Sequence, residues 1–174
     1  AATDQATDTP TNNFATLNPL TFEHNSDRIF TEGNTHIDLG DTGRVPEVST
    51  IGMTSGKWYA EGKVIGGGGG VSIFGITGTM YRSGNTVLLA ADAYDYCYTG
   101  DGDKINNGSD ASYGDTYTDD DIIGIAVDLD NLKLYFSKNG TWQDSGDPTS
   151  GGTGTGAAYT ITAPSSTTDG VYFL

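Results

Sequence analysis

The chain has 174 residues, the size of one domain that buries roughly 70% of its unfolded surface. Its 8 basic and 23 acidic residues give a formal net charge of −15, which repels nucleic-acid phosphates and anionic membrane surfaces. The single cysteine excludes an internal disulfide framework, and no apolar run approaches the ~20 residues that a membrane span needs.

The composition favours an all-β fold. The chain contains 26 glycines and 10 tyrosines, and residues that favour helices are few. Short strands joined by glycine-rich turns have this composition, as in an antiparallel β-sandwich or barrel. No helical periodicity longer than two turns interrupts the pattern.

The first twenty residues are polar and contain two prolines, so we expect residues 1–20 to form an extended arm before one domain, residues 21–174. Two alternatives stay open for the arm. It lies on its own domain as a surface segment, or it adds to the sheet of a neighbouring subunit. In the second case its large apolar residues would make the assembly contacts: Phe14, Leu17 and Leu20.

Strand periodicity starts after the arm. Residues 57–64 alternate between an apolar and a polar face, and residues 71–76 and 86–91 form two further short strands. The apolar face of the first strand carries Trp58, Ala60 and Val64. The glycine run 66–70 is interpreted as a hairpin turn between the first two strands, because no Lys-Ser or Lys-Thr pair follows to make it a phosphate loop.

The next extended segment places Tyr94, Tyr96 and Tyr98 on one side. These rings are candidates for a platform on which a sugar stacks, with Asp92 and Asp95 nearby to bind hydroxyl groups. The alternative is that the rings cover the sheet and strengthen pairs between strands.

Residues 119–142 carry the clearest strand pattern, although five of their first twelve positions are aspartate. One face is apolar and comprises Ile123, Ile125, Val127 and Leu129. Asp130-Asn131 and Asn139-Gly140 have turn chemistry, so we interpret the aspartates as turn and solvent-facing residues. Residues 145–158 are then expected to form a long loop, and residues 169–174 a closing strand.

Three segments in this order resemble the SPRY (B30.2-like) family. They read "SGKWYAEGKV", "FGI" and "DDDIIGIAVDLDNLKLYFSKNGTW", and the resemblance covers about residues 50–174. It implies a bent antiparallel β-sandwich of the concanavalin-like jelly-roll type. SPRY domains are generally binding and scaffolding modules without a shared catalytic apparatus, and variable loops determine their partners. The stretch "PTNNFATLNPL" is similar to segments that precede SPRY-like modules in phage and environmental bacterial proteins.

Candidate catalytic and metal sites are weak. The only histidines are His24 and His36, and neither lies near a nucleophile motif, so we expect no enzyme and no cofactor. Calcium is the one exception, because an irregular acidic loop could bind it through Asp101, Asp103 and Asp110. The alternative is a solvated acidic loop.

Two Asn-Gly-Ser/Thr sequons, at Asn107 and Asn139, lie on expected turns and could accept glycans. We expect a structural or adhesive subunit of an extracellular assembly, such as a surface filament or a virion fibre or decoration, that associates with itself through the arm. The alternative is a recognition module that binds a surface glycan or a protein through its loops and the tyrosine stripe. The Ala-Ala-Thr start is compatible with a trimmed signal peptide, which would place the protein outside the cell.

Overall fold

The computed structural model describes residues 14–20, 28–38, 47–66, 72–80 and 90–174. It is an antiparallel β-sandwich, as expected. One layer, the front sheet, has the strand order β10-β9-β8-β3, and β11 pairs with β9 outside this path. Its strands are β3 (Lys57–Lys63), β8 (Ile122–Asp128), β9 (Lys133–Lys138), β10 (Thr141–Trp142) and β11 (Tyr159–Thr160).

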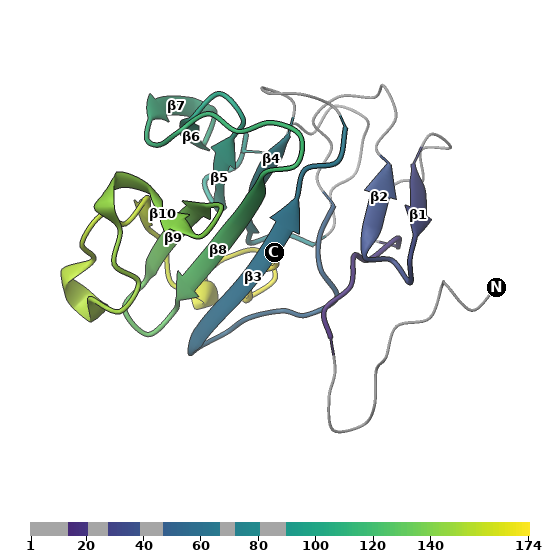
Figure 1. Ribbon diagram of the computed structural model, residues 1–174. Helices are drawn as coiled ribbons and strands as arrows, with labels where there is room; N and C mark the ends of the chain where they lie inside the picture. The colour runs from purple at the N-terminus through teal and green to yellow at the C-terminus, as the bar shows by residue number, and fades with distance from the viewer. Residues whose placement is uncertain (1–13, 21–27, 39–46, 67–71, 81–89) are drawn as a thin grey trace.

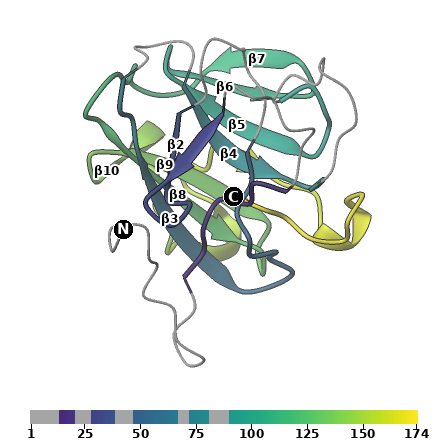
Figure 2. The ribbon, with the colours of Figure 1, turned by 90° about the vertical axis from the view of Figure 1, so that its right-hand side faces the viewer.

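The second layer, the back sheet, has the strand order β4-β5-β6-β7. Its strands are β4 (Ile73–Thr77), β5 (Asp95–Thr99), β6 (Asp103–Asn106) and β7 (Ser109–Ser112). β1 (Ile29–Thr31) and β2 (His36–Asp38) form a separate hairpin. Three short 3₁₀ segments follow the main strands: η1 (Gln143–Ser145), η2 (Gly151–Thr153) and η3 (Pro164–Ser166). Figures 1 and 2 show the front sheet and the back sheet as two layers.

The core lies between the two sheets. β8 and β9 contribute Ile123, Ile125, Val127, Leu134 and Phe136, all buried, so the predicted alternation in residues 119–142 is confirmed. The back sheet and its connections contribute mainly aromatic rings, namely Tyr96, Tyr98, Tyr117 and Tyr172. The two halves of the core meet where the ring centroids of Tyr98 and Phe136 lie 5.4 Å apart.

The predicted hairpin around the glycine run is wrong. β3 pairs with β8 and β4 pairs with β5, so the strands on either side of residues 66–70 belong to different sheets. β3 and β4 instead face one another across the sandwich, since a Cβ atom added to Gly62 would collide with the Phe74 ring. Alternation identifies a strand, but it does not identify the strand's partner.

The turns of the front sheet follow their sequence only in part. Asn139 and Gly140 have φ angles of 49° and 80° and close the two-residue turn between β9 and β10, as predicted. The connection between β8 and β9 is longer than the predicted Asp-Asn turn, because Asp128 pairs with Lys133. The residue with positive φ in this connection is Leu132, at 57°.

Both ends of the described chain extend the back sheet. Phe173 pairs with Thr77 of β4, and Tyr172 pairs with Met53, so the predicted closing strand is present as two bridges. Leu17 in turn pairs with Ser49. Residues 16–18 of the arm therefore bond to their own domain, while residues 1–13 lie outside the described residues, as do residues 86–89 of the strand expected at 86–91.

Candidate interaction surface

The outer face of the front sheet carries aromatic side chains that the solvent reaches. The register pairs Tyr59 with Ala126 and Ala126 with Tyr135, so these residues share one face. In the neighbouring row Glu61 pairs with Gly124, Gly124 with Ser137, and Ser137 with Trp142. We call the accessible part of this surface the aromatic face, defined by Tyr59, Glu61 and Trp142.

Tyr59 is the most exposed ring of the aromatic face, with 55% of its surface accessible. It meets Trp142 edge to face, with ring centroids 6.2 Å apart and an interplanar angle of 68°. Its hydroxyl donates a hydrogen bond of 2.6 Å to the Glu61 carboxylate. This bond is the main reason that the pKa of Tyr59 lies above its ordinary value, and partial burial adds to it.

A glycine makes room for the Tyr59 ring. A Cβ atom added to Gly124 would lie 2.8 Å from the Tyr59 hydroxyl and still closer to the Ser137 hydroxyl. The ring and its hydroxyl therefore lie over the backbone of β8. Gly124 thus helps to fix the position of an aromatic side chain that remains accessible to a partner.

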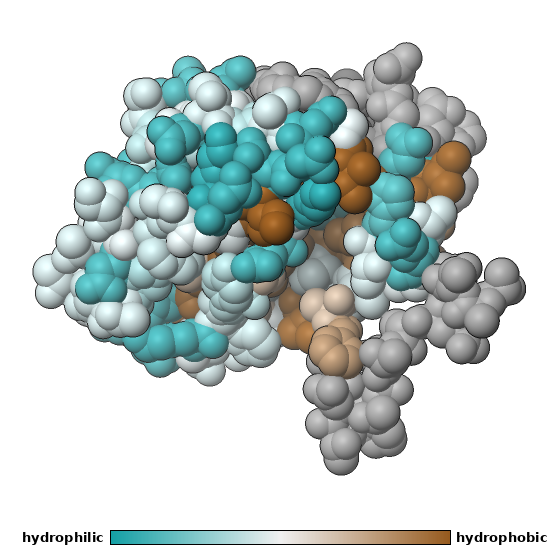
Figure 3. Space-filling view, in the orientation of Figure 1, coloured by the Kyte–Doolittle hydropathy of each residue, from teal (hydrophilic) through white to brown (hydrophobic). Residues whose placement is uncertain are grey.

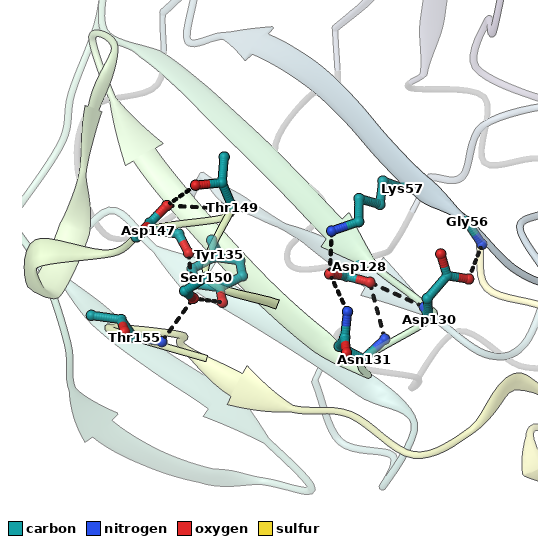
Figure 4. A network of polar contacts seen from close by, with 10 residues as sticks. All are labelled: Gly56, Lys57, Asp128, Asp130, Asn131, Tyr135, Asp147, Thr149, Ser150 and Thr155. Carbon is teal, nitrogen blue, oxygen red and sulfur yellow. Dashed lines mark hydrogen bonds and ion pairs between the residues drawn. The ribbon is translucent and has the colours of Figure 1, made fainter. Parts of the chain in front are cut away.

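The loop that carries η1 and η2 covers the adjoining part of the outer face over β9 (Figure 4). Asp147 accepts hydrogen bonds from the backbone N–H and the hydroxyl of Thr149, at 2.8 and 2.6 Å. The Ser150 hydroxyl donates to the Asp147 carbonyl at 2.6 Å and accepts from the Thr155 N–H at 3.0 Å. It also lies 3.2 Å from the Tyr135 hydroxyl, which connects the loop to the sheet.

A second network orders the end of the sheet near the start of β3 (Figure 4). The buried Asp128 carboxylate binds Lys57 at 2.9 Å and accepts hydrogen bonds from the backbone of Asp130 and Asn131. Burial alone would raise the pKa of Asp128, but the bonds from Lys57 and Asn131 outweigh it and lower the pKa below its usual range. Asp130 in turn accepts from the Gly56 N–H at 2.9 Å.

The described tyrosines of the predicted stripe do not form a surface platform. Tyr96 and Tyr98 are buried in the core, and the Tyr96 hydroxyl lies 3.1 Å from the Thr162 hydroxyl. Tyr94 packs against the same core. Asp95 is buried and accepts a hydrogen bond from Thr77, and Asp92 lies half-buried in the preceding turn, where it accepts from the Tyr94 N–H. The stripe therefore faces the opposite sheet, and a sugar has no access to Tyr96 or Tyr98.

The predicted calcium residues are not brought together. Among the described residues, no group of three or more His, Cys, Asp or Glu side chains is arranged to hold a metal ion. The acidic segment forms the β6-β7 hairpin, in which Asp103 pairs with Ser112 and Asp110 pairs with Ile105, while Asp101 lies in the preceding turn. The register places Asp103 and Asp110 on the same face of the hairpin but two positions apart, and no third acidic ligand is arranged beside them among the described residues.

The remaining predicted residues lie on separate parts of the molecule. Phe14 is exposed, Leu20 is 87% exposed, and Leu17 is half-buried where its N–H donates to Asn34. His36 contacts the Thr31 hydroxyl through Nδ1 at 2.9 Å, and His24 lies outside the described residues.

The two sequon asparagines both occupy turns, as predicted. Asn107 is exposed in the β6-β7 turn with φ 52°. The Asn139 amide donates to Asp121 at 2.7 Å and accepts from the Ile122 N–H at 2.9 Å, so a glycan on Asn139 would displace a structural contact.

Sequence reasoning missed Tyr59 and Trp142 as a pair. The alternation in residues 57–64 places Tyr59 on the polar face of its strand. Trp142 lies two residues after the Asn139-Gly140 turn, far from Tyr59 in the sequence. The register of three strands brings them together, and partner choice among strands is not encoded in alternation.

Figure 3 shows the front-sheet side of the molecule, where apolar residues appear as small separate patches within a largely hydrophilic surface. Within the described ranges, no helix is both long and apolar enough to cross a membrane.

Comparison with known proteins agrees with this architecture. The family model of the SPRY domain matches residues 57–160. The crystal structure of the SPRY domain of human HERC1 is similar to the chain with a TM-score of 0.57 and 15% sequence identity, covering 79% of this chain and 76% of that one. The family match spans β3 to β11, including every strand that builds the aromatic face. The chain belongs to the SPRY domain family.

Proposed function

We propose that the chain is a non-enzymatic protein-binding module that contacts its partner through the aromatic face. The observation that carries the proposal is an exposed Tyr59 packed edge to face against Trp142 on a rigid sheet. Tyrosine and tryptophan are enriched among the residues that dominate binding energy at protein interfaces. Membership of the SPRY family supports the proposal, because its domains are generally binding modules.

The loops beside the aromatic face support the same function. Asp147, Ser150 and Asp128 bond the backbone of their own loops, so these loops have little conformational freedom left to lose on binding. Loops ordered before binding raise affinity by lowering the entropy cost of association. The order of these loops before binding therefore favours the aromatic face as the surface that meets the partner.

The geometry favours a protein partner over a glycan. The rings of Tyr59 and Trp142 are inclined by 68°, so they cannot both lie flat against successive rings of one sugar chain. A side chain or a backbone bend of a protein can contact a ring face and a ring edge together. A glycan ligand is the competing outcome of the test below.

The test uses peptides selected from a displayed random library against the immobilised full chain. Tyr59→Ala and Trp142→Ala should each weaken binding of the selected peptides at least about tenfold, which corresponds to about 1.4 kcal/mol. Ile29→Ala is the matched control, because it removes an exposed side chain from the separate β1-β2 hairpin. Unchanged affinity in both aromatic variants, or ligands found only on a glycan array, would contradict the proposal.

Within this function, we propose a finer role as a structural or adhesive subunit of an extracellular assembly, such as a surface filament or a virion fibre or decoration. The exposed Phe14 and Leu20 of the arm support self-association, because they offer apolar surface that a second copy could bury. Residues 16–18 bond to their own domain, so the arm can be tested without disturbing that contact by deleting residues 1–13 and replacing the exposed Phe14 and Leu20 with alanine. Light scattering and negative-stain imaging should then show that large assemblies disappear; assemblies unchanged by the deletion would exclude the arm mechanism.

A further inference from the structure

β3 forms an open edge of the front sheet. The Val64 N–H donates to the Asp121 carbonyl at 3.0 Å, and the Leu129 N–H donates to the Gly56 carbonyl at 2.9 Å. Between these two bonds, the even-numbered residues of β3 therefore direct their backbone N–H and C=O groups toward β8. Backbone groups alternate sides along an antiparallel strand. The N–H and C=O groups that point away from the sheet therefore belong to Lys57, Tyr59, Glu61 and Lys63.

These outward groups have no partner in the part of the chain that the structure describes. Among the described residues, no backbone or side-chain group bonds to the main chain of Lys57, Tyr59, Glu61 or Lys63 on this side. All four residues are also exposed. An open strand edge of seven residues is a template on which another strand can pair.

The other described edges are shorter and offer fewer groups. β7 has four residues, and β10 and β11 have two each. Folded proteins commonly protect an edge with lysines, and β3 has one near each end. Here, however, Lys57 binds Asp128 at 2.9 Å and Lys63 binds Asp120 at 2.7 Å, so the charges that would keep a second strand away are locally balanced.

We propose that β3 pairs antiparallel with β3 of a second copy of this chain, about a twofold axis at Ala60. This register is the one that pairs every outward group, because Lys57 then lies opposite Lys63 of the second copy and Tyr59 lies opposite Glu61 of the second copy. Each such pair exchanges two backbone hydrogen bonds. The two front sheets become one continuous sheet, and the contact is the same on both copies.

The central side chains are complementary in the same register, whereas Lys57 and Lys63 of the two copies face one another, each paired with an aspartate of its own chain. Tyr59 meets Glu61 of the second copy on the outer face, with the chemistry of the 2.6 Å hydrogen bond that it makes within its own chain. On the inner face Trp58, which is 37% exposed, lies opposite Gly62 of the second copy, over which the Phe74 ring of that copy packs. The biological use of this contact rests on the proposed assembly role, in which it would connect two copies of the chain. The contact itself does not involve the arm.

The test is the oligomeric state of the full chain, measured by analytical ultracentrifugation over a concentration series. Glu61→Pro removes an outward N–H and no bond to β8, so the fold should survive while the dimer dissociation constant rises at least tenfold. Asp110→Pro is the matched control. The backbone N–H of Asp110 points away from β6 on the edge strand β7, so the substitution removes an equivalent group from another edge, and the variant should still form the dimer. Circular dichroism establishes that both variants fold.

A second variant keeps the proposal testable if the proline disrupts the fold. Glu61→Lys leaves the backbone intact and places a third positive charge on the β3 edge, so it should also weaken the dimer, most strongly at low salt. A wild-type chain that stays monomeric, or a dimer unaffected by both Glu61 variants, would overturn the proposal. Deletion of residues 1–13 should leave the dimer intact even where it abolishes larger assemblies, so failure of the arm and failure of the edge are distinguishable.

Discussion

The two groups of aromatic residues on the two sheets have opposite roles. Tyr96 and Tyr98 lie on one side of a strand, as predicted, but that side is buried. Tyr59 and Trp142 remain accessible on the outer face of the front sheet. Both pairs obey the period of a strand. The difference lies in what covers each face, since the back sheet directs its tyrosines toward β8 and β9. A sequence pattern therefore assigns a side chain to a face, and the packing of the two layers decides whether a partner can reach it.

The largest loss of stability is expected from a substitution in the buried aromatic group. Tyr98→Ala should lower the free energy of unfolding by about 3–5 kcal/mol, because it leaves a cavity beside Phe136 and Tyr117. Tyr59→Ala should cost less than about 1 kcal/mol, as an exposed position does. Urea unfolding of both variants measures the difference, and similar losses for the two would show that Tyr59 is also a core residue.

An intermediate effect should follow from filling the space beneath Tyr59. Gly124→Ala places a methyl group against the hydroxyls of Tyr59 and Ser137, so the ring must move. We expect a loss of about 1–3 kcal/mol in stability and a weaker interaction with the peptides selected for the aromatic face. Thermal unfolding and peptide binding measure the two effects. Ala126→Ser, a small change in the neighbouring row of the same strand, is the control and should disturb binding less.

Acid should weaken the ordered surroundings of the aromatic face. The folded pKa of Asp128 lies below its ordinary value of 3.8, because bonds from Lys57 and Asn131 overcome the effect of burial. A lowered pKa contributes stability that is complete above the unfolded value and is lost as pH falls through the folded one. Unfolding free energy should therefore decline below about pH 4, and the decline should be smaller in Asp128→Asn. An identical pH profile in the variant would exclude this carboxylate as a cause.

The smallest effect concerns the exposed hydroxyl. Tyr59→Phe should change stability by less than about 0.5 kcal/mol. In the wild type, the hydrogen bond to Glu61 raises the pKa of Tyr59, so Glu61→Gln should return it toward its ordinary value of 10.0. Ultraviolet titration of the phenol measures the change. A pKa that does not move would mean that Glu61 does not hold the Tyr59 hydroxyl in solution.

Much of the fold could be predicted from the sequence, and much less of the site. Alternation located β3, β8 and β9, and Asn139-Gly140 located a turn, because both signals are local. The pairing of β3 with β8 joins residues far apart in the sequence. The glycine run, a local signal, therefore suggests a hairpin that does not form. The acidic segment that forms the β6-β7 hairpin is likewise predicted as a loop. Asn107-Gly108 is interpreted only as a turn that could carry a glycan, and not as the turn of a hairpin.

The aromatic face, and not the buried tyrosine group, is expected to meet the partner. The chain contains 2 tryptophans, which give two indole N–H signals in a nitrogen-15 NMR spectrum. Trp142 lies on the aromatic face, whereas the indole of Trp58 donates to its own backbone at Ser55, 2.8 Å away. Titration with a selected peptide should shift the Trp142 signal and leave the Trp58 signal in place. A shift confined to Trp58, or no shift in either indole at saturation, would contradict binding at the aromatic face.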